Sequence, residues 1–247
     1  MGDALPARRG SYRPRLGSSD HHIVRLVGAF VERALDAHVR AGSAVLDVGC
    51  GEQPLRAGIE ARGGRYTGVD VTQNAAGSVD VVASAEDVPL PDAAYDVVLC
   101  TEVLEHVPDG DAAFDELARL VRPGGVVVVT VPFLYRLHEE PHDHRRVTPH
   151  GVRRWAERAG LRVEELAALG NEAHVLATVW GGVWEAVARP RWMLLRVPLR
   201  LAQRVACGAA NLAASAATAL APRAFPGHAH LDVAAVLRRA PAAERAT

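Results

Sequence analysis

Two acidic residues at the ends of neighbouring apolar stretches are the first candidates for chemistry in this sequence. Asp47 lies in the run of residues 45–51, which ends in a glycine turn, and Asp70 ends the stretch 66–70. A glycine turn lets a ligand approach the backbone closely, and an acid at the end of the following strand suits the two hydroxyls of a ribose. The pattern therefore indicates a site for an adenosine-type ligand.

The residues around the turn predict the charge of that ligand. Glu52 and Gln53 follow Gly51, so the turn lacks the G-x-G-x-x-G pattern that receives a pyrophosphate. Asp47 and Glu52 would repel a phosphate, whereas they would attract a cationic cofactor that carries an amino acid. This favours a cationic nucleoside over a pyridine dinucleotide.

A dense polar block at residues 138–150 is the candidate substrate side. It begins just beyond an apolar stretch that ends at Pro132, where parallel sheets place their ligand crevice. Three hypotheses compete for it. A His or Asp could deprotonate a substrate hydroxyl, because imidazole titrates near neutral pH. A divalent ion could be gathered by His138, His142, His144 and Asp143. Alternatively, Asp143 and Arg146 pair structurally and Thr148 caps a helix. Because no spacing here is specific for zinc, we expect no metal site.

Alternating strands and helices must position these groups. Apolar runs predict strands at 44–48, 65–70, 79–83, 95–101, 126–131, 161–166 and 230–237, and helical periodicity predicts helices at 21–39, 55–61, 111–121 and 149–159. Asp20 and Thr148 are the expected N-caps of two of these helices. Near-continuous apolar strands that alternate with helices are typical of a parallel sheet covered on both faces.

Four blocks in this order resemble the class I S-adenosylmethionine-dependent methyltransferases, and most closely their small-molecule, ubiquinone-biosynthesis-like branch. The blocks are V-L-D-V-G-C-G at 45–51, Y-T-G-V-D at 66–70, the stretch 85–100 and L-V-R-P-G-G-V-V-V-V-T-V-P at 120–132. The resemblance implies an α/β fold with a Rossmann-like seven-stranded, mostly parallel sheet, helices on both faces, an antiparallel last strand and a helical insertion before that strand. It divides the chain into an N-terminal segment with a lid helix over the cofactor cleft (1–42), a cofactor-binding core (43–170), the insertion (171–227) and the final strand with its tail (228–247).

The resemblance also assigns residues. Asp47, Gly49 and Gly51 would surround the methionine portion of S-adenosylmethionine, and Asp70 would hold the ribose. Relatives often carry an acid where Ser84 stands, so Glu86, Asp87 or the backbone would meet the adenine. The full expected cofactor set is Asp47, Gly49, Cys50, Gly51, Asp70, Val71, Ser84, Ala85, Glu86, Cys100 and Thr101.

On the substrate side, the polar block resembles the pattern H-x-x-P-x-D-x-x-R-x-T-P-x-G of a subset of these enzymes. We expect His138, Asp143 and Arg146 to be catalytic, together with His106, which ends the stretch E-V-L-E-H. The expected acceptor contacts are His21, His22, Phe133, His142, Trp180 and Trp184.

The insertion has an unusual charge distribution. After Glu185 its charged residues are all arginines, and Arg196, Arg200 and Arg204 would share one face of a helix. Such a helix can lie on an anionic membrane as a peripheral contact. The alternative is a lid or homodimer surface through residues 186–223. Residues 205–222 include Asn211, Ser215 and Thr218, so we expect no membrane-spanning helix there.

Together these features predict an enzyme that transfers the methyl group of S-adenosylmethionine, leaving S-adenosylhomocysteine, to a small or medium-sized molecule. We expect a hydroxyl oxygen of a secondary metabolite, quinone-like or lipid-linked acceptor; C- or N-methylation, or a non-catalytic cofactor-binding regulator that acts through the insertion, are the alternatives. A net charge of -1 over 247 residues gives no nucleic-acid footprint. Three scattered cysteines and no secretory signal favour a cytoplasmic protein, with peripheral membrane attachment as a variant.

Overall fold

The computed structural model describes residues 12–187 and 193–241, without the side chains of 193–196. Arg189, Arg191 and the side chain of Arg196 therefore lie outside the described residues. The strands are β1 (Ala44–Val48), β2 (Arg65–Asp70), β3 (Val81–Val82), β4 (Tyr95–Thr101), β5 (Val121–Pro132), β6 (Leu161–Leu169) and β7 (Asp232–Arg239). The helices are α1 (His21–His38), α2 (Arg56–Ala61), α3 (Gly110–Leu120), α4 (Pro149–Arg158), α5 (Glu172–Val187) and α6 (Met193–Leu220), followed by a short 3-10 turn, Pro222–Ala224.

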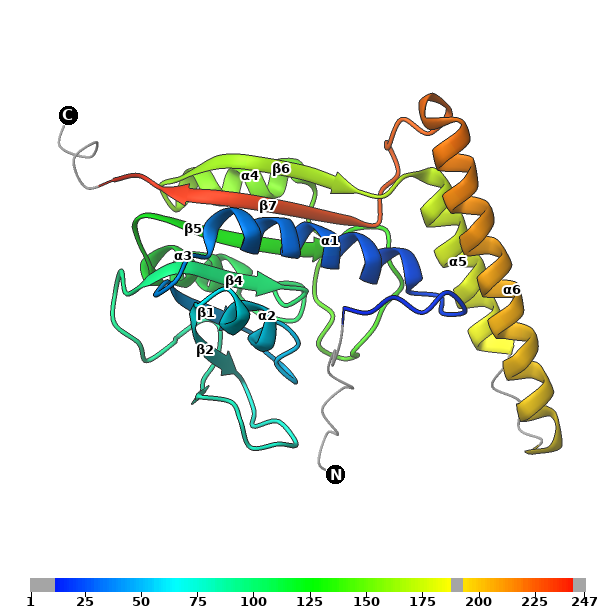
Figure 1. The fold of residues 1–247 in the computed structure, drawn as a ribbon, viewed down its shortest axis with the longest axis horizontal. Coiled ribbons are helices and arrows are strands. Elements are labelled where there is room, and N and C mark those ends of the chain that lie inside the picture. The colour runs from blue at the N-terminus through cyan, green and yellow to red at the C-terminus, as the bar shows by residue number, and fades with distance from the viewer. Residues whose placement is uncertain (1–11, 188–192, 242–247) are drawn as a thin grey trace.

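The seven strands form one sheet in the order β3-β2-β1-β4-β5-β7-β6 (Figure 1). β1 pairs in parallel with both β2 and β4, so the chain leaves β1 toward one edge and then returns on its other side. The gap between the carboxyl ends of two such strands is where open α/β sheets bind ligands. β7 is antiparallel and lies between β5 and β6. The predicted fold, including the antiparallel last strand, is confirmed.

Helices cover both faces because side chains alternate along each strand. Leu46, Val98 and Val127 belong to a core that includes Phe114 of α3 and Val152 of α4. Val45, Val97, Leu99 and Val128 point to the opposite face, where they pack with α1 and α2. The strongly apolar strands are thus buried on both sides, as their sequences indicate.

Several element ends differ from the predictions. β5 and β6 are longer and β7 begins and ends two residues later, because these three strands pair along their length. β3 is shorter than predicted, because the amide of Val79 donates to the Gln73 side chain (2.8 Å) instead of a neighbouring strand. Thr148 caps α4 as expected, since its hydroxyl accepts from the Gly151 amide at 3.1 Å. Asp20 occupies the N-cap position of α1 but makes no capping bond, because its carboxylate is turned to the Ser18 hydroxyl.

The insertion forms a helical hairpin of α5 and α6 at the end of the molecule toward which β4 and β5 point (Figure 1). A small core joins the two helices, made by Ala173, Ala177 and Ala214. Within the described part of the chain, no helix has the length and apolarity needed to cross a membrane.

Candidate active site

A cavity of about 270 Å³ opens at the carboxyl ends of β1, β2 and β4, where the strand order of the sheet reverses. Its wall contains most of the residues expected to meet the cofactor: Asp47, Gly49, Cys50, Gly51, Asp70, Val71, Ser84, Ala85 and Thr101. Two of the expected catalytic residues, His106 and His138, line the same cavity. The structure therefore brings the two groups of predicted residues into one site.

The glycine turn after β1 packs so closely against Val103 that a side chain would not fit there. Gly49 has a φ of +75°, and a Cβ on it would lie 2.2 Å from a methyl carbon of Val103. The amides of Gly49 and Cys50 both donate to the Val69 carbonyl, at 2.8 and 3.0 Å, so the turn is fixed to β2. Only glycine fits this backbone conformation without strain.

Asp47 provides a buried negative charge at the floor of the cavity. Its carboxylate accepts a hydrogen bond from the Tyr66 hydroxyl (2.8 Å). Burial raises the pKa of Asp47 to about 6; the Tyr66 hydrogen bond lowers it and the nearby charge of Asp70 raises it. A carboxylate that is destabilised by burial gains most from a cationic partner. The ammonium of a methionine portion meets this requirement.

Asp70 is oriented by the backbone before any ligand arrives. One carboxylate oxygen accepts from the Gly51 amide at 2.8 Å, and the other accepts from the Thr72 amide at 3.3 Å. Each carboxylate oxygen has further lone pairs that can accept the hydroxyls of a ribose. The two acids and the glycine turn together fit S-adenosylmethionine.

Of the other residues expected on the cofactor side, some line the cavity and others lie behind its wall. Ser84 and Ala85 line the cavity, whereas Glu86 accepts a hydrogen bond from the Asp109 amide (2.6 Å) ahead of α3. Cys100 is buried beneath the cavity wall. Burial raises the pKa of Cys50 to about 12, so this cysteine stays a thiol and is unsuited to act as a nucleophile.

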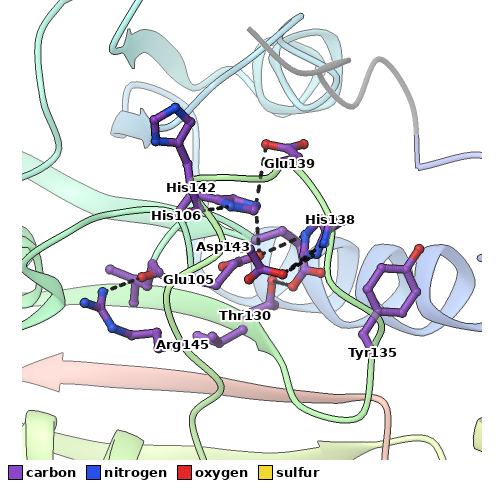
Figure 2. Close-up of polar contacts among 12 residues, drawn as sticks. Glu105, His106, Thr130, Tyr135, His138, Glu139, His142, Asp143 and Arg145 are labelled. Atoms are coloured by element: carbon purple, nitrogen blue, oxygen red, sulfur yellow. Dashed lines mark hydrogen bonds and ion pairs between the residues drawn. The ribbon is translucent and has the colours of Figure 1, made fainter. Parts of the chain in front are cut away.

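His138 is held by a second layer of charged residues. Its Nδ1 atom lies 3.3 Å from Asp143 Oδ2, and its backbone amide donates to the same oxygen at 3.0 Å (Figure 2). Arg146 binds both oxygens of Asp143. Burial alone would raise the pKa of Asp143, but the hydrogen bonds from Arg146 and from the His138 amide lower it to about 2. Asp143 and Arg146 therefore position His138 rather than line the cavity.

Glu105 is a central residue of this site that the predictions omitted. Its side chain is fully buried, and neither carboxylate oxygen has a hydrogen-bond partner among the described residues. Its Oε1 atom lies 3.5 Å from His106 Nε2 and 3.8 Å from His138 Nε2 (Figure 2). Burial, with a contribution from Glu102, raises the pKa of Glu105 well above its usual range. The three side chains are also close enough to share a cation.

Two of the four residues in the metal hypothesis, His142 and His144, lie apart from this group. His142 and His144 are exposed, and His142 takes part in the site through its carbonyl, 3.1 Å from His106 Nδ1. In Figure 2 the His142 ring points away from the histidine pair. Any cation in this region would thus meet Glu105, His106 and His138 instead.

Several expected acceptor contacts do not line the cavity. His21, His22 and His174 form a buried group where α1 meets α5, and Phe133 stacks on His230. Trp180 and Trp184 lie on α5 in the hairpin, where Trp180 is half exposed. Helical periodicity over residues 21–39 predicted α1, but it did not indicate which face of the helix would lie toward the cavity.

Other wall residues come from segments that the sequence did not link to the site. Tyr12 precedes α1, and its hydroxyl lies 2.8 Å from the Thr101 hydroxyl across the cavity. Glu102, Val103 and Glu139 also line the wall. The sequence pointed to Glu102, because this residue begins the stretch that ends at His106. It contained no pattern that pointed to Tyr12.

Comparisons with known proteins agree with this geometry. A family model described as "Methyltransferase domain" matches residues 46–129. A ubiquinone biosynthesis O-methyltransferase from Dechloromonas aromatica is 32% identical over 162 residues, which cover 52% of this chain and 68% of that protein. Two solved structures share the fold at 16% identity. One is the Burkholderia thailandensis 1,6-didemethyltoxoflavin-N1-methyltransferase with S-adenosylhomocysteine (TM-score 0.53), and the match covers 90% of this chain and 84% of that one. The other is the Haemonchus contortus phosphoethanolamine N-methyltransferase 2 with S-adenosyl-L-methionine (TM-score 0.55), and the match covers 85% of this chain and 52% of that one.

Proposed function

Because the chain belongs to the class I S-adenosylmethionine-dependent methyltransferases, we propose that it methylates a hydroxyl oxygen of a small or medium-sized apolar acceptor. The predictions of this family, of an enzyme and of this cofactor are confirmed. The proposed acceptor is a secondary metabolite, a quinone-like compound or a lipid-linked compound. The Dechloromonas relative is an O-methyltransferase, which supports an oxygen acceptor.

The donor supplies a methyl group on a sulfonium, which is itself a good leaving group. The protein must therefore hold the acceptor oxygen in line with that methyl in a dry cavity. Asp47, Gly49 and Asp70 would orient the donor at the carboxyl ends of β1 and β2. Orientation of this kind can lower the barrier by roughly 7–11 kcal/mol.

The arrangement of His138 carries the proposal of a hydroxyl acceptor. Nδ1 of His138 lies 3.3 Å from the Asp143 carboxylate without forming a hydrogen bond, and Nε2 is the nitrogen that we assign to the substrate proton. Burial, followed by the charge of His106, lowers the pKa of His138, so its ring is neutral near pH 7. A neutral imidazole can take the proton as the oxygen attacks the methyl, and such a base contributes roughly 10²–10⁴-fold to the rate.

The lining of the cavity supports an apolar acceptor. Val103, Val107 and Pro108 line the cavity and stand within three residues of His106 in the sequence. These side chains would remove apolar surface of the acceptor from water, and each Å² buried in this way stabilises the complex by about 25 cal/mol.

The test is a panel of acceptors incubated with S-adenosylmethionine, with product detected by mass. We expect an apolar phenol to be methylated on oxygen in preference to a free sugar or an amine. His138→Gln should lower kcat roughly 10²–10⁴-fold while the affinity for S-adenosylhomocysteine stays unchanged. Asp143→Asn should lower kcat less, because it keeps the His138 ring but removes the carboxylate beside Nδ1. Since that carboxylate raises the pKa of His138, the acidic limb of the pH–rate profile should move to lower pH in this variant.

Two results would contradict the proposal. If the enzyme methylates carbon or nitrogen in preference to oxygen, the acceptor group is not a hydroxyl. A turnover that is lost on chelation with EDTA and restored by a divalent metal would assign His138 to a cation with Glu105 and His106 instead of to proton transfer.

We also propose a surface contact through residues 186–223, either with a membrane or with a second copy of the chain. This segment contains no acidic residue, and its described arginines, Arg200, Arg204 and Arg223, are exposed.

A further inference from the structure

The hairpin of α5 and α6 leaves an unusual amount of apolar surface uncovered. Of the fifteen exposed large apolar residues in the described chain, ten lie on these two helices. On α5 they form a single stripe along one side of the helix: Leu176, Val179, Trp180, Val183 and Val187. On α6 they are Val197, Leu201, Val205, Leu212 and Leu220. Single exposed apolar residues need no explanation, but a contiguous set of this length indicates an interaction site.

The charges of the hairpin select the kind of partner. Between Glu185 and Asp232 the sequence has six arginines and no acidic residue. Arg200 and Arg204 are exposed, and the Cα and Cβ of Arg204 also pack beside Gly17 in the segment before α1. The one acid at the end of α5, Glu185, is turned inward, where it pairs with Arg136 at 2.9 Å. The exposed charged side chains among the described residues of the hairpin from Glu185 onward are therefore arginines, beside a large exposed apolar surface.

We propose that this hairpin docks the enzyme on an anionic phospholipid surface. A second copy of the chain would bring the same arginines against each other, which like charges disfavour. A nucleic acid would be attracted to the arginines but would leave the apolar stripes exposed. An anionic membrane interface accommodates both, because apolar side chains enter the acyl boundary while arginines meet the headgroups.

The hairpin is also connected to both segments that cover the active-site cavity. Asn211 of α6 donates to the carbonyls of Leu16 and Ser18, at 2.8 and 2.9 Å, in the segment that begins with Tyr12. Arg136, which pairs with Glu185, lies in the same loop as His138, between β5 and α4. The inner face of the hairpin thus holds the cover of the cavity while its outer face is free to meet a surface. Docking itself does not depend on the proposed function. The proposed function enters only if a docked enzyme takes a lipid-linked acceptor from the membrane.

Vesicle sedimentation with the full chain tests docking without any methyl transfer. We expect the protein to sediment with vesicles of phosphatidylcholine and phosphatidylglycerol, but not with phosphatidylcholine alone, and to be released by high salt. Arg200→Gln combined with Arg204→Gln should weaken binding roughly 30-fold, since each basic residue near such a surface contributes about 1 kcal/mol. Val183→Glu should weaken binding further by placing a charge in the α5 stripe.

Matched controls separate docking from general charge or folding effects. Arg65→Gln on β2 and Val82→Glu on β3 change an exposed arginine and an exposed valine away from the hairpin, and should leave vesicle binding unchanged. Calorimetry with S-adenosylhomocysteine should give wild-type affinity for every variant, which shows that each has folded.

Binding that is equal for neutral and anionic vesicles, or that all the variants share, would overturn the proposal. So would a solution mass of two chains that Val183→Glu returns to one, since the stripe would then be a dimer surface. Because no acceptor is present, these outcomes are independent of whether a hydroxyl is the methylated group.

Discussion

The buried carboxylate of Asp47 makes cofactor affinity depend on pH in a way that the structure fixes in sign and size. Its pKa is raised to about 6, so in the free enzyme this group is mostly protonated below that pH. An ammonium partner needs the ionised form. Binding must therefore remove the proton, and affinity should fall as the pH drops through 6.

The magnitude follows from the ionised fraction. At about pH 5, one unit below the pKa, close to one tenth of the carboxylate is ionised, so the affinity should be about tenfold weaker than at pH 8, or about 1.4 kcal/mol. Isothermal titration with S-adenosylhomocysteine measures this without turnover. Repeating the titration in buffers of different ionisation enthalpy should show close to one proton released at pH 5 and none at pH 8.

Two variants locate the effect. Tyr66→Phe removes the hydrogen bond that lowers the pKa of Asp47, so the midpoint should move to higher pH. Asp47→Asn should bind weakly at every pH, with no proton release. An affinity that stays constant from pH 8 to pH 5 in the wild type would refute the assignment of Asp47 to the ammonium.

Two further predictions concern the backbone and its caps. Gly49→Ala should destabilise the fold and abolish S-adenosylhomocysteine binding by calorimetry, whereas Gly42→Ala, which has a similar positive φ but nothing within 4 Å, should cost only about 1–2 kcal/mol and leave binding intact. Equal losses in the two variants would show that the contact with Val103 is unimportant. Thr148→Ala should lower the free energy of unfolding in urea by about 1 kcal/mol through the lost cap of α4. Asp20→Ala should change it little, and a larger loss there would contradict the observed geometry.

The donor side of the site could be predicted because its chemistry is local in sequence. Asp47 and the glycine turn are contiguous, and Asp70 ends the very next strand, so one βαβ unit carries them all. The strands were predictable for a related reason, since burial on both faces gives each of them an uninterrupted apolar run.

The acceptor side depends on contacts between distant segments, which periodicity does not specify. Glu105 matters because His138, in a loop more than thirty residues later, packs beside it. Tyr12 reaches Thr101 from a segment that packs on Gly28 of α1 and is hydrogen-bonded to Asn211 of the hairpin. The tryptophans of α5 were expected at the acceptor because the insertion is apolar, but apolarity alone does not say which surface a helix covers.

The position of β7 has a consequence for how this protein is made. Residues 232–239 complete the interior of the sheet, and β6 is joined to the remaining strands only through them. A growing chain that has already emerged as far as α6 would still have an unpaired edge on β5 and an unattached β6. Its apolar surfaces would stay uncovered until the final strand arrives, and such partly assembled sheets are prone to aggregate. Productive folding is therefore expected to await the emergence of residues 232–239 from the ribosome.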